Sequence, residues 1–364
     1  MLFQGCRNMC KGQIHDLLIA LPKCEHHIHV EGALTPRLLF KFAARNNVDL
    51  ASADDKMYTS EEQLQARYGS FASLAEFIRY FTFGSSVLLT AEDFKELAYD
   101  YFTKAHEQSV KHAEVFFDPQ AHTSRGIAYE TVIQGLSRAK QQAEHEFGMS
   151  IEYIPCILRH HGLDSATRMF QEVKDAGHFA DGVVAGLGMA GDELVHPPEY
   201  FKLIYDDART AGVRCTAHVG QAGPAKFVSS ALENLQAKRV DHAWIAKTDN
   251  QLMQRLAETN TLVTLCPISN FTLGFVGSIA EVPIREFLDR GVRFSINSDD
   301  PAYFGNYIQE NYCAVQDAFD LTESDWRTIA LNAVEGSWCS DKRKKVLEDQ
   351  VTTAITRWKA TQAA

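Results

Sequence analysis

Paired cysteine spacings and long apolar runs are both missing from this sequence. Its eight cysteines are scattered without any C-x-x-C pair, and four of them lie in apolar, strand-like runs where a free cysteine acts as a small hydrophobe. This usage is typical of a reducing compartment, so we expect a cytoplasmic protein, with the nucleus as the alternative. No apolar run approaches the ~18 residues of a membrane-spanning helix.

Positive charge is also in short supply. The net charge is −11, from 36 basic and 47 acidic residues. This balance argues against a general attraction to nucleic acid or to an anionic membrane, and we expect neither as a partner. Residues 1–13 contain no hydrophobic stretch of the kind found in signal peptides, so we treat 1–15 as an N-terminal extension that is not an element of the barrel. The sequence does not indicate an oligomeric state.

A glycine-rich phosphate loop is absent as well, and this matters for the fold. What is present is an alternation of short apolar runs with longer amphipathic segments, which favours parallel strands covered by helices. A doubly wound sheet needs glycines after its first strand, whereas this chain reads Val30-Glu31-Gly32-Ala33. The expected strands number eight: Cys24–Val30, His112–Phe117, Ile151–Leu158, Gly182–Leu187, Val213–His218, Arg239–His242, Thr261–Cys266 and Val292–Asn297.

Eight strand–helix units in a chain of this length predict an α/β fold of the (β/α)8 TIM-barrel type, formed by residues 1–364 as a single domain. Helical patterns fill most of the intervals: Pro36–Asn46, Ala91–Gln108, Ile127–Phe147, Leu163–Ala176, Pro197–Ala211, Ala225–Gln236, Asn250–Thr259 and Ile284–Arg290. The long interval 33–110 between the first two strands predicts extra helices inserted over the barrel mouth.

Candidate metal ligands stand where the expected strands end. His27 and His29 are two residues apart in the first strand, so their side chains share one face. His218, His242 and Asp299 follow the fifth, sixth and eighth strands. In a barrel these ends meet at one face, where three of the four histidines and the aspartate can ligate one metal, a set that is typical of a catalytic zinc site.

The number of metal ions follows from a residue that is missing. Barrel hydrolases with two metals need a bridging anion, commonly a carboxylated lysine at the end of strand four. Strand four here ends Gly186-Leu187-Gly188-Met189-Ala190-Gly191 and has no lysine. We therefore expect one zinc ion per chain.

These residues together resemble the adenosine/adenine deaminase family of the amidohydrolase barrels, over about residues 20–340. The motifs are Pro22-Lys23-x-Glu25-x-His27-x-His29-x-Glu31-Gly32, Leu265-Cys266-Pro267-Ile268-Ser269-Asn270 and Ser298-Asp299-Asp300-Pro301. Phe116-Phe117-Asp118-Pro119-Gln120-Ala121-His122 and Arg239-Val240-Asp241-His242 are more similar to the adenine branch. Met189-Ala190-Gly191-Asp192-Glu193 is more similar to the adenosine branch.

The resemblance implies a role for each motif residue. His27, His29, His218 and Asp299 would hold zinc, which lowers the pKa of a bound water toward ~7. His242 would orient that water, and Asp299 would also take part in catalysis. The resemblance assigns substrate contacts to four residues, Asp300 near purine N7, the Gly191 backbone near N3, His29 and Glu31.

One catalytic position departs from the family. The family has a glutamate three residues after the strand-five histidine, and it protonates N1 of the ring. This chain has Gln221 there, and a glutamine can donate a hydrogen bond but cannot deliver a proton. Such a proton transfer is typically worth ~10²–10⁴ in rate. Val219 and the pair Ala243-Trp244 also differ from the family's usual alanine and glycine.

Three functional hypotheses remain open from the sequence. The first is hydrolytic deamination of a 6-aminopurine, most simply adenine to hypoxanthine and ammonia, with activity reduced or altered by Gln221. The second is deamination of a different heterocyclic amine. The third is a purine-binding homologue that turns over weakly, or an engineered inactive variant. All three give the protein a purine or a related heterocycle as its small-molecule partner.

Overall fold

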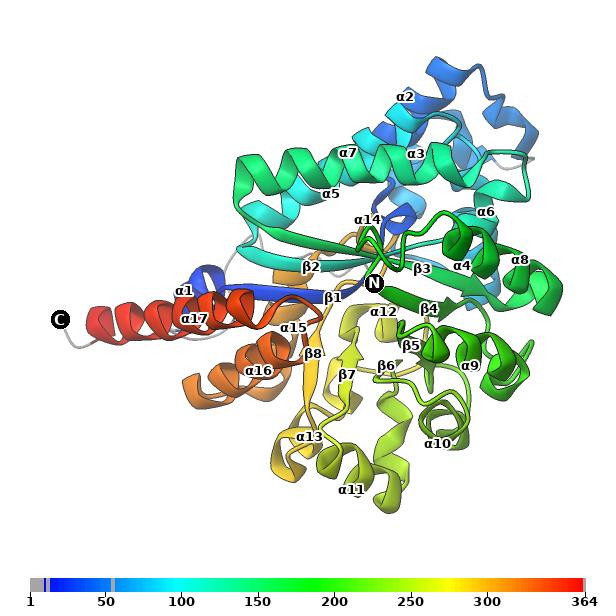
Figure 1. The fold of residues 1–364 in the computed structure, drawn as a ribbon. Coiled ribbons are helices and arrows are strands. Elements are labelled where there is room, and N and C mark those ends of the chain that lie inside the picture. Colours follow the sequence, from blue (N-terminus) through cyan, green and yellow to red (C-terminus); the bar gives the residue numbers. More distant parts are fainter. Residues whose placement is uncertain (1–9, 11–13, 54–55, 363–364) are drawn as a thin grey trace.

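Eight parallel strands form one sheet, with neighbours in the order in which they occur along the chain (Figure 1). The computed structural model describes residues 10, 14–53 and 56–362. The strands are β1 (Lys23–His29), β2 (Val110–Phe117), β3 (Ser150–Leu158), β4 (Gly186–Ala190), β5 (Arg214–Val219), β6 (Arg239–His242), β7 (Leu262–Leu265) and β8 (Phe294–Ile296). The predicted α/β barrel is confirmed.

Asp299 brings the last strand back to the first. Its backbone N–H donates to the carbonyl of His27 at 3.0 Å, and its own carbonyl accepts from the N–H of His29 at 2.9 Å. The same segment pairs Ile28 with Asp299 in parallel register. The seam between β1 and β8 is therefore joined by backbone that also carries three candidate metal ligands.

Helices surround the barrel (Figure 1). The α-helices are α1 (His15–Ala20), α2 (Pro36–Asn46), α3 (Glu61–Arg67), α4 (Leu74–Ser85), α5 (Ala91–Glu107), α6 (Pro119–Thr123), α7 (Tyr129–Phe147), α8 (Gly162–Asp175), α9 (Lys202–Thr210), α10 (Ala225–Glu233), α11 (Asn250–Glu258), α12 (Pro267–Thr272), α13 (Ile284–Arg290), α14 (Pro301–Phe304), α15 (Ile308–Phe319), α16 (Glu323–Gly336) and α17 (Asp341–Gln362). Short 3-10 turns are η1 (Glu31–Ala33), η2 (Leu50–Ala53), η3 (Lys56–Thr59), η4 (Arg159–His161), η5 (Pro198–Phe201), η6 (Trp244–Thr248) and η7 (Ile279–Glu281).

The interval between β1 and β2 holds four α-helices, α2 to α5, as the length of that interval predicts. All four begin at a Ser or Thr side-chain cap, and α4 and α5 serve as examples. Ser73 accepts from the backbone N–H of Glu76 at the start of α4, and Thr90 forms a capping box with Asp93 at the start of α5. Such caps satisfy N–H groups that have no partner within the helix.

Most predicted strand boundaries differ from the observed ones by one or two residues, and the largest error is in the fourth strand. The expected fourth strand, Gly182–Leu187, begins too early, because the observed β4 runs Gly186–Ala190. Gly182 has φ of +79°, a left-handed conformation that belongs to a turn and not to a strand. The apolar pair Val183-Val184 misled the pattern, since these residues lead into the strand without pairing in it.

No helix in the described part of the chain is both long enough and apolar enough to cross a bilayer. The expected N-terminal extension lies largely outside the described residues. The main apolar core packs the helices against the outside of the barrel, and a smaller apolar cluster is made of Phe116, Ile154, Cys156, Leu158 and Ala190.

Candidate active site

The predicted ligands converge at the mouth of the barrel. His29 Nε2 lies 3.0 Å from His218 Nε2, and Asp299 Oδ1 lies 3.1 Å from His27 Nε2 and 3.7 Å from His29 Nε2. Zinc–nitrogen bonds of about 2.0–2.1 Å in tetrahedral geometry place neighbouring ligand atoms roughly 3.3 Å apart. The observed separations lie on either side of that value, so the donor set fits a zinc ion.

His242 belongs to the same group of side chains. Ligand atoms of His27, His218, His242 and Asp299 all lie within 4.8 Å of one another, and His242 Nε2 is 3.9 Å from Asp299 Oδ2. His27 Nε2 is buried without a hydrogen-bond partner among the described residues. We call these four residues and His29 the metal cluster. A buried polar atom with no partner is costly unless a ligand satisfies it.

A second layer of polar side chains holds the ligands in place. Thr264 Oγ1 lies 2.9 Å from His27 Nδ1 and donates to Asp241 Oδ1 at 2.9 Å. The other Asp241 oxygen lies 3.4 Å from His218 Nδ1. Ser269 Oγ donates to Asp299 Oδ2 at 2.6 Å. Such partners fix the orientation of ligating rings and leave their other nitrogen free for a metal.

Protonation in the cluster also suits metal binding. Burial lowers the pKa of His29, His218 and His242, and neighbouring imidazoles lower each pKa further. The neutral ring, which is the form that binds metals, is therefore favoured. Burial alone would raise the pKa of Asp299, but the surrounding imidazoles of His27 and His242 hold that pKa well below its ordinary value.

Backbone strain coincides with the ends of β6 and β8. His242, Ala243 and Asp299 have φ of +62°, +42° and +66°. Side chains other than glycine pay roughly 1–2 kcal/mol for this left-handed region. Strain of this kind persists where the surrounding structure enforces it, and it clusters at functional sites. Two of the three strained residues belong to the metal cluster.

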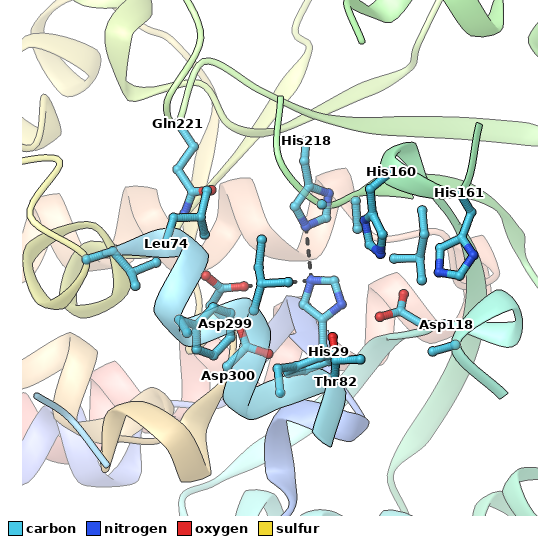
Figure 2. Close-up of a pocket in the computed structure, with 18 of the residues that line it drawn as sticks. His29, Leu74, Thr82, Asp118, His160, His161, His218, Gln221, Asp299 and Asp300 are labelled. Carbon is cyan, nitrogen blue, oxygen red and sulfur yellow. Dashed lines mark hydrogen bonds and ion pairs between the residues drawn. The ribbon is translucent and has the colours of Figure 1, made fainter. Parts of the chain in front are cut away.

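A cavity of about 170 Å³ opens beside the cluster, and Asp300, Gly191 and Gln221 line it. Figure 2 shows Gln221 on one side of the His29–His218 pair and Asp118, His160 and His161 on the other. Residues of the insertion cover the cavity, all from α4: Leu74, Phe77, Ile78, Phe81 and Thr82. The helical cover predicted for the barrel mouth thus contributes directly to the pocket.

Asp300 and Asp299 are adjacent carboxyl groups with opposite tendencies. Burial raises the pKa of Asp300 well above its ordinary value, and the adjacent Asp299 carboxylate raises it further. Asp300 Oδ1 is also buried without a partner in the described structure. A neutral carboxyl can donate a hydrogen bond, so Asp300 is equipped to meet an acceptor atom on a substrate.

The loop that carries Gln221, residues 220–223, is fixed by a residue that the sequence reasoning missed. We call this segment the β5 loop. The buried carboxylate of Glu193 accepts from the backbone N–H groups of Gly220 and Gln221 at 2.7 Å, and of Ala222 at 3.0 Å. Trp244 Nε1 donates to the carbonyl of Gln221 at 3.0 Å. Only its place in the Gly-Asp-Glu run after β4 could have drawn attention to Glu193.

Arg159 and His122 are two further buried side chains that support the barrel mouth, and the sequence reasoning assigned neither of them a role. Arg159 donates to the carbonyls of His196 and His218, which ties the end of β3 to the end of β5. His122 Nε2 lies 2.9 Å from Glu31 Oε1. Glu31, expected to contact substrate, is fully buried beside Asp118, whose N–H donates to the same oxygen at 3.1 Å. The substrate role of Glu31 remains a prediction.

An α/β barrel with imidazoles and a carboxylate gathered at its mouth defines a metal-dependent hydrolase of the amidohydrolase type. The family model described as adenosine deaminase matches residues 22–354, and the chain belongs to that family. The adenine deaminase of Aspergillus oryzae is 49% identical over 349 residues, which cover 96% of this chain and 99% of that protein.

Solved structures agree with the sequence comparison. The crystal structure of adenine deaminase from Arthrobacter aurescens has a TM-score of 0.86 and 36% identity, and it covers 93% of this chain and 100% of that one. An amidohydrolase from Burkholderia ambifaria, crystallised with bound zinc, has a TM-score of 0.86 and 27% identity, with coverage of 99% and 97%. These relatives confirm the fold and the family.

Proposed function

We propose that this chain hydrolyses the exocyclic amine of a 6-aminopurine, with adenine as the first candidate, and releases hypoxanthine and ammonia. The observation that carries the proposal is a complete cluster of ligand side chains that opens into a cavity lined by Asp300 and Gly191. Relatives named adenine deaminase, 46% and 49% identical over nearly the whole chain, support the choice of substrate.

The donor set fits one zinc ion in the barrel mouth, held by His27, His29, His218 and Asp299. A zinc ion held there supplies Lewis acidity and brings the pKa of a bound water toward neutrality. The relative crystallised with zinc supports the identity of the metal. His242 would orient that water and stabilise developing negative charge, and its Nε2, 3.9 Å from Asp299 Oδ2, supports this role.

Base recognition is assigned to the pocket's hydrogen-bonding groups. The neutral Asp300 carboxyl would donate to N7 of the purine, and the backbone of Gly191 would meet N3. Gly191 has φ of +88°, and a Cβ at this position would stand 3.1 Å from His160 Nδ1. A side chain here would therefore be both strained and crowded, which keeps the backbone open to a ligand.

A free base suits the pocket better than a nucleoside. The cavity is covered by α4, and Asp118 lines its far side. Asp118 belongs to the segment Phe116–His122, which is more similar to the adenine branch, and this likeness supports a free base. Adenine is accordingly preferred to adenosine.

The missing proton donor makes this enzyme slow on adenine. Gln221 can donate an amide hydrogen bond to N1 but cannot deliver a proton. Glu193 is no substitute, because both of its oxygens accept backbone N–H groups of the β5 loop. The described structure therefore offers no proton donor at the position where the family has its glutamate.

A second candidate function follows from the chemistry of Gln221. Its amide oxygen can accept a hydrogen bond, so a ring whose N1 already carries hydrogen would be held without any proton transfer from the protein. A 6-amino-2-oxopurine in its N1–H form is such a ring. A homologue that binds purine but turns over poorly is the remaining outcome.

The test measures ammonia release from adenine, adenosine and a 6-amino-2-oxopurine, together with the matching products hypoxanthine, inosine and xanthine, for the native chain and Gln221→Glu. Restoring the acid should raise kcat with adenine at least ~10²-fold, or about 2.7 kcal/mol of barrier, with a small change in KM. Gln65→Glu, an exposed position on α3, controls for added charge. A native rate with adenine already at ~1–10³ per second would contradict our account of Gln221.

A further inference from the structure

A second group of metal-binding side chains lies away from the barrel mouth, near the start of β1. Cys10 Sγ is 2.7 Å from His15 Nδ1 and 3.1 Å from Cys313 Sγ. The three ligand atoms lie within 4.8 Å of one another. Both cysteines are buried, and His15 is partly buried at the start of α1. Two sulfurs and an imidazole nitrogen thus converge from segments almost 300 residues apart.

A neighbouring amide points to a ligand at this place. Gln309 Nε2 donates to Cys313 Sγ at 3.4 Å, one helical turn away on α15. The other amide atom, Oε1, is buried with no hydrogen-bond partner among the described residues, and the side chain is only 8% exposed. An acceptor left without a partner costs free energy, and a cation beside Cys313 would remove that cost.

The three side chains also limit which metal could bind. Sulfur and imidazole ligands select zinc or a softer ion over magnesium or calcium.

We propose that Cys10, His15 and Cys313 bind a second zinc ion, which fastens the segment before α1 to α15. The convergent imidazole favours a metal over a simple disulfide, because a disulfide would use only the two sulfurs. Gln309, by turning its amide, or a water molecule would complete a four-coordinate site. The site is structural and sits apart from the metal cluster. It raises the zinc content from the one ion expected in the barrel mouth to two per chain.

Cobalt substitution tests this proposal on the native protein, prepared under reducing conditions. Cobalt bound by thiolates gives an intense charge-transfer absorption that a site of imidazoles and a carboxylate does not give. We expect that band, together with two zinc ions per chain in the zinc form. A native protein with one zinc ion per chain and no such band would overturn the proposal. A Cys10–Cys313 disulfide, found by mass spectrometry of the intact protein after preparation under reducing conditions, would also overturn it.

Variants locate the second ion. Cys10→Ser, Cys313→Ser and the less disruptive His15→Ala should each lose one zinc and most of the cobalt band, while keeping turnover within about twofold of the native rate. Cys339→Ser, a buried cysteine on another segment, serves as the matched control and should keep both. His218→Ala should lose the other zinc and retain the band. Loss of the band in Cys339→Ser, or its survival in Cys313→Ser, would place the thiolate site elsewhere and refute the assignment.

Discussion

The metal cluster and the β5 loop face the same cavity, and both are held firmly, but they differ in what they present to a substrate. Behind the cluster, Thr264, Asp241 and Ser269 contact the ligands and leave their metal-facing atoms free. Behind the β5 loop, Glu193 and Trp244 hold the backbone equally well, yet the side chain presented is the amide of Gln221. The comparison teaches that a firmly built scaffold does not guarantee a complete set of catalytic groups.

The largest effect should follow from breaking the metal cluster. His218→Ala removes an imidazole 3.0 Å from His29, so zinc at the mouth should be lost. Since a metal supplies several kcal/mol to such a reaction, kcat should fall by at least ~10³-fold. Zinc content by elemental analysis and turnover of adenine check this. His145→Ala, exposed on α7, is the control, and unchanged metal content in His218→Ala would refute the ligand assignment.

Asp300 separates metal binding from recognition of the base. Asp300→Asn keeps the shape but replaces a donating carboxyl group with an amide. The amide still donates, but from a nitrogen instead of a hydroxyl, so we expect kcat/KM to fall by up to about tenfold, the worth of one neutral hydrogen bond of about 0.5–1.5 kcal/mol, with zinc content unchanged. The exposed Asp289→Asn on α13 is the matched control. Loss of zinc in Asp300→Asn would move this residue into the metal cluster.

Glu193 tests whether the scaffold of the β5 loop matters by itself. Glu193→Gln replaces a carboxyl group that accepts three backbone N–H groups with an amide. The amide's own N–H groups would face those backbone N–H groups, and two donors cannot form a hydrogen bond. We expect stability to fall by about 1–3 kcal/mol, seen as a Tm lower by a few degrees. The rate gained from Gln221→Glu should shrink in the double variant, because the new acid would be poorly placed. Glu286→Gln on α13 controls for the lost charge.

The smallest effect on stability and turnover is expected at Ala243, a residue with a strained backbone beside the β5 loop. Ala243→Gly relieves a φ of +42° that costs roughly 1–2 kcal/mol. The same change removes a buried methyl group, whose burial stabilises the folded state by about 0.8 kcal/mol. It also raises the conformational entropy of the unfolded chain, which lowers stability by about 0.4–1 kcal/mol. The terms nearly cancel, so Tm and turnover should stay close to the native values. A large rise in Tm would show that the strain is not offset by packing.

The sequence predicted the barrel and the gathering of the candidate metal ligands at its mouth because both depend on local patterns. Eight apolar runs between helical segments required parallel strands, and the spacing of His27 and His29 placed them on one face. The start of β4 could not be predicted, since Val183-Val184 looks like a strand until Gly182 is seen in a turn. Glu193 and Arg159 were missed because they act on backbone groups of distant segments, which leave no mark on the local pattern.

Closure of the barrel at Asp299 has a consequence for biosynthesis. His27 and His29 leave the ribosome early, whereas Asp299, whose backbone joins β8 to β1, is made when about four-fifths of the chain exists. The nascent protein therefore has no complete metal site and no closed barrel for most of its synthesis. The full set of ligands and the pairing of the first strand with the last therefore both become possible only at this late stage. A truncated product that ends before Asp299 would have an open barrel and an incomplete ligand set.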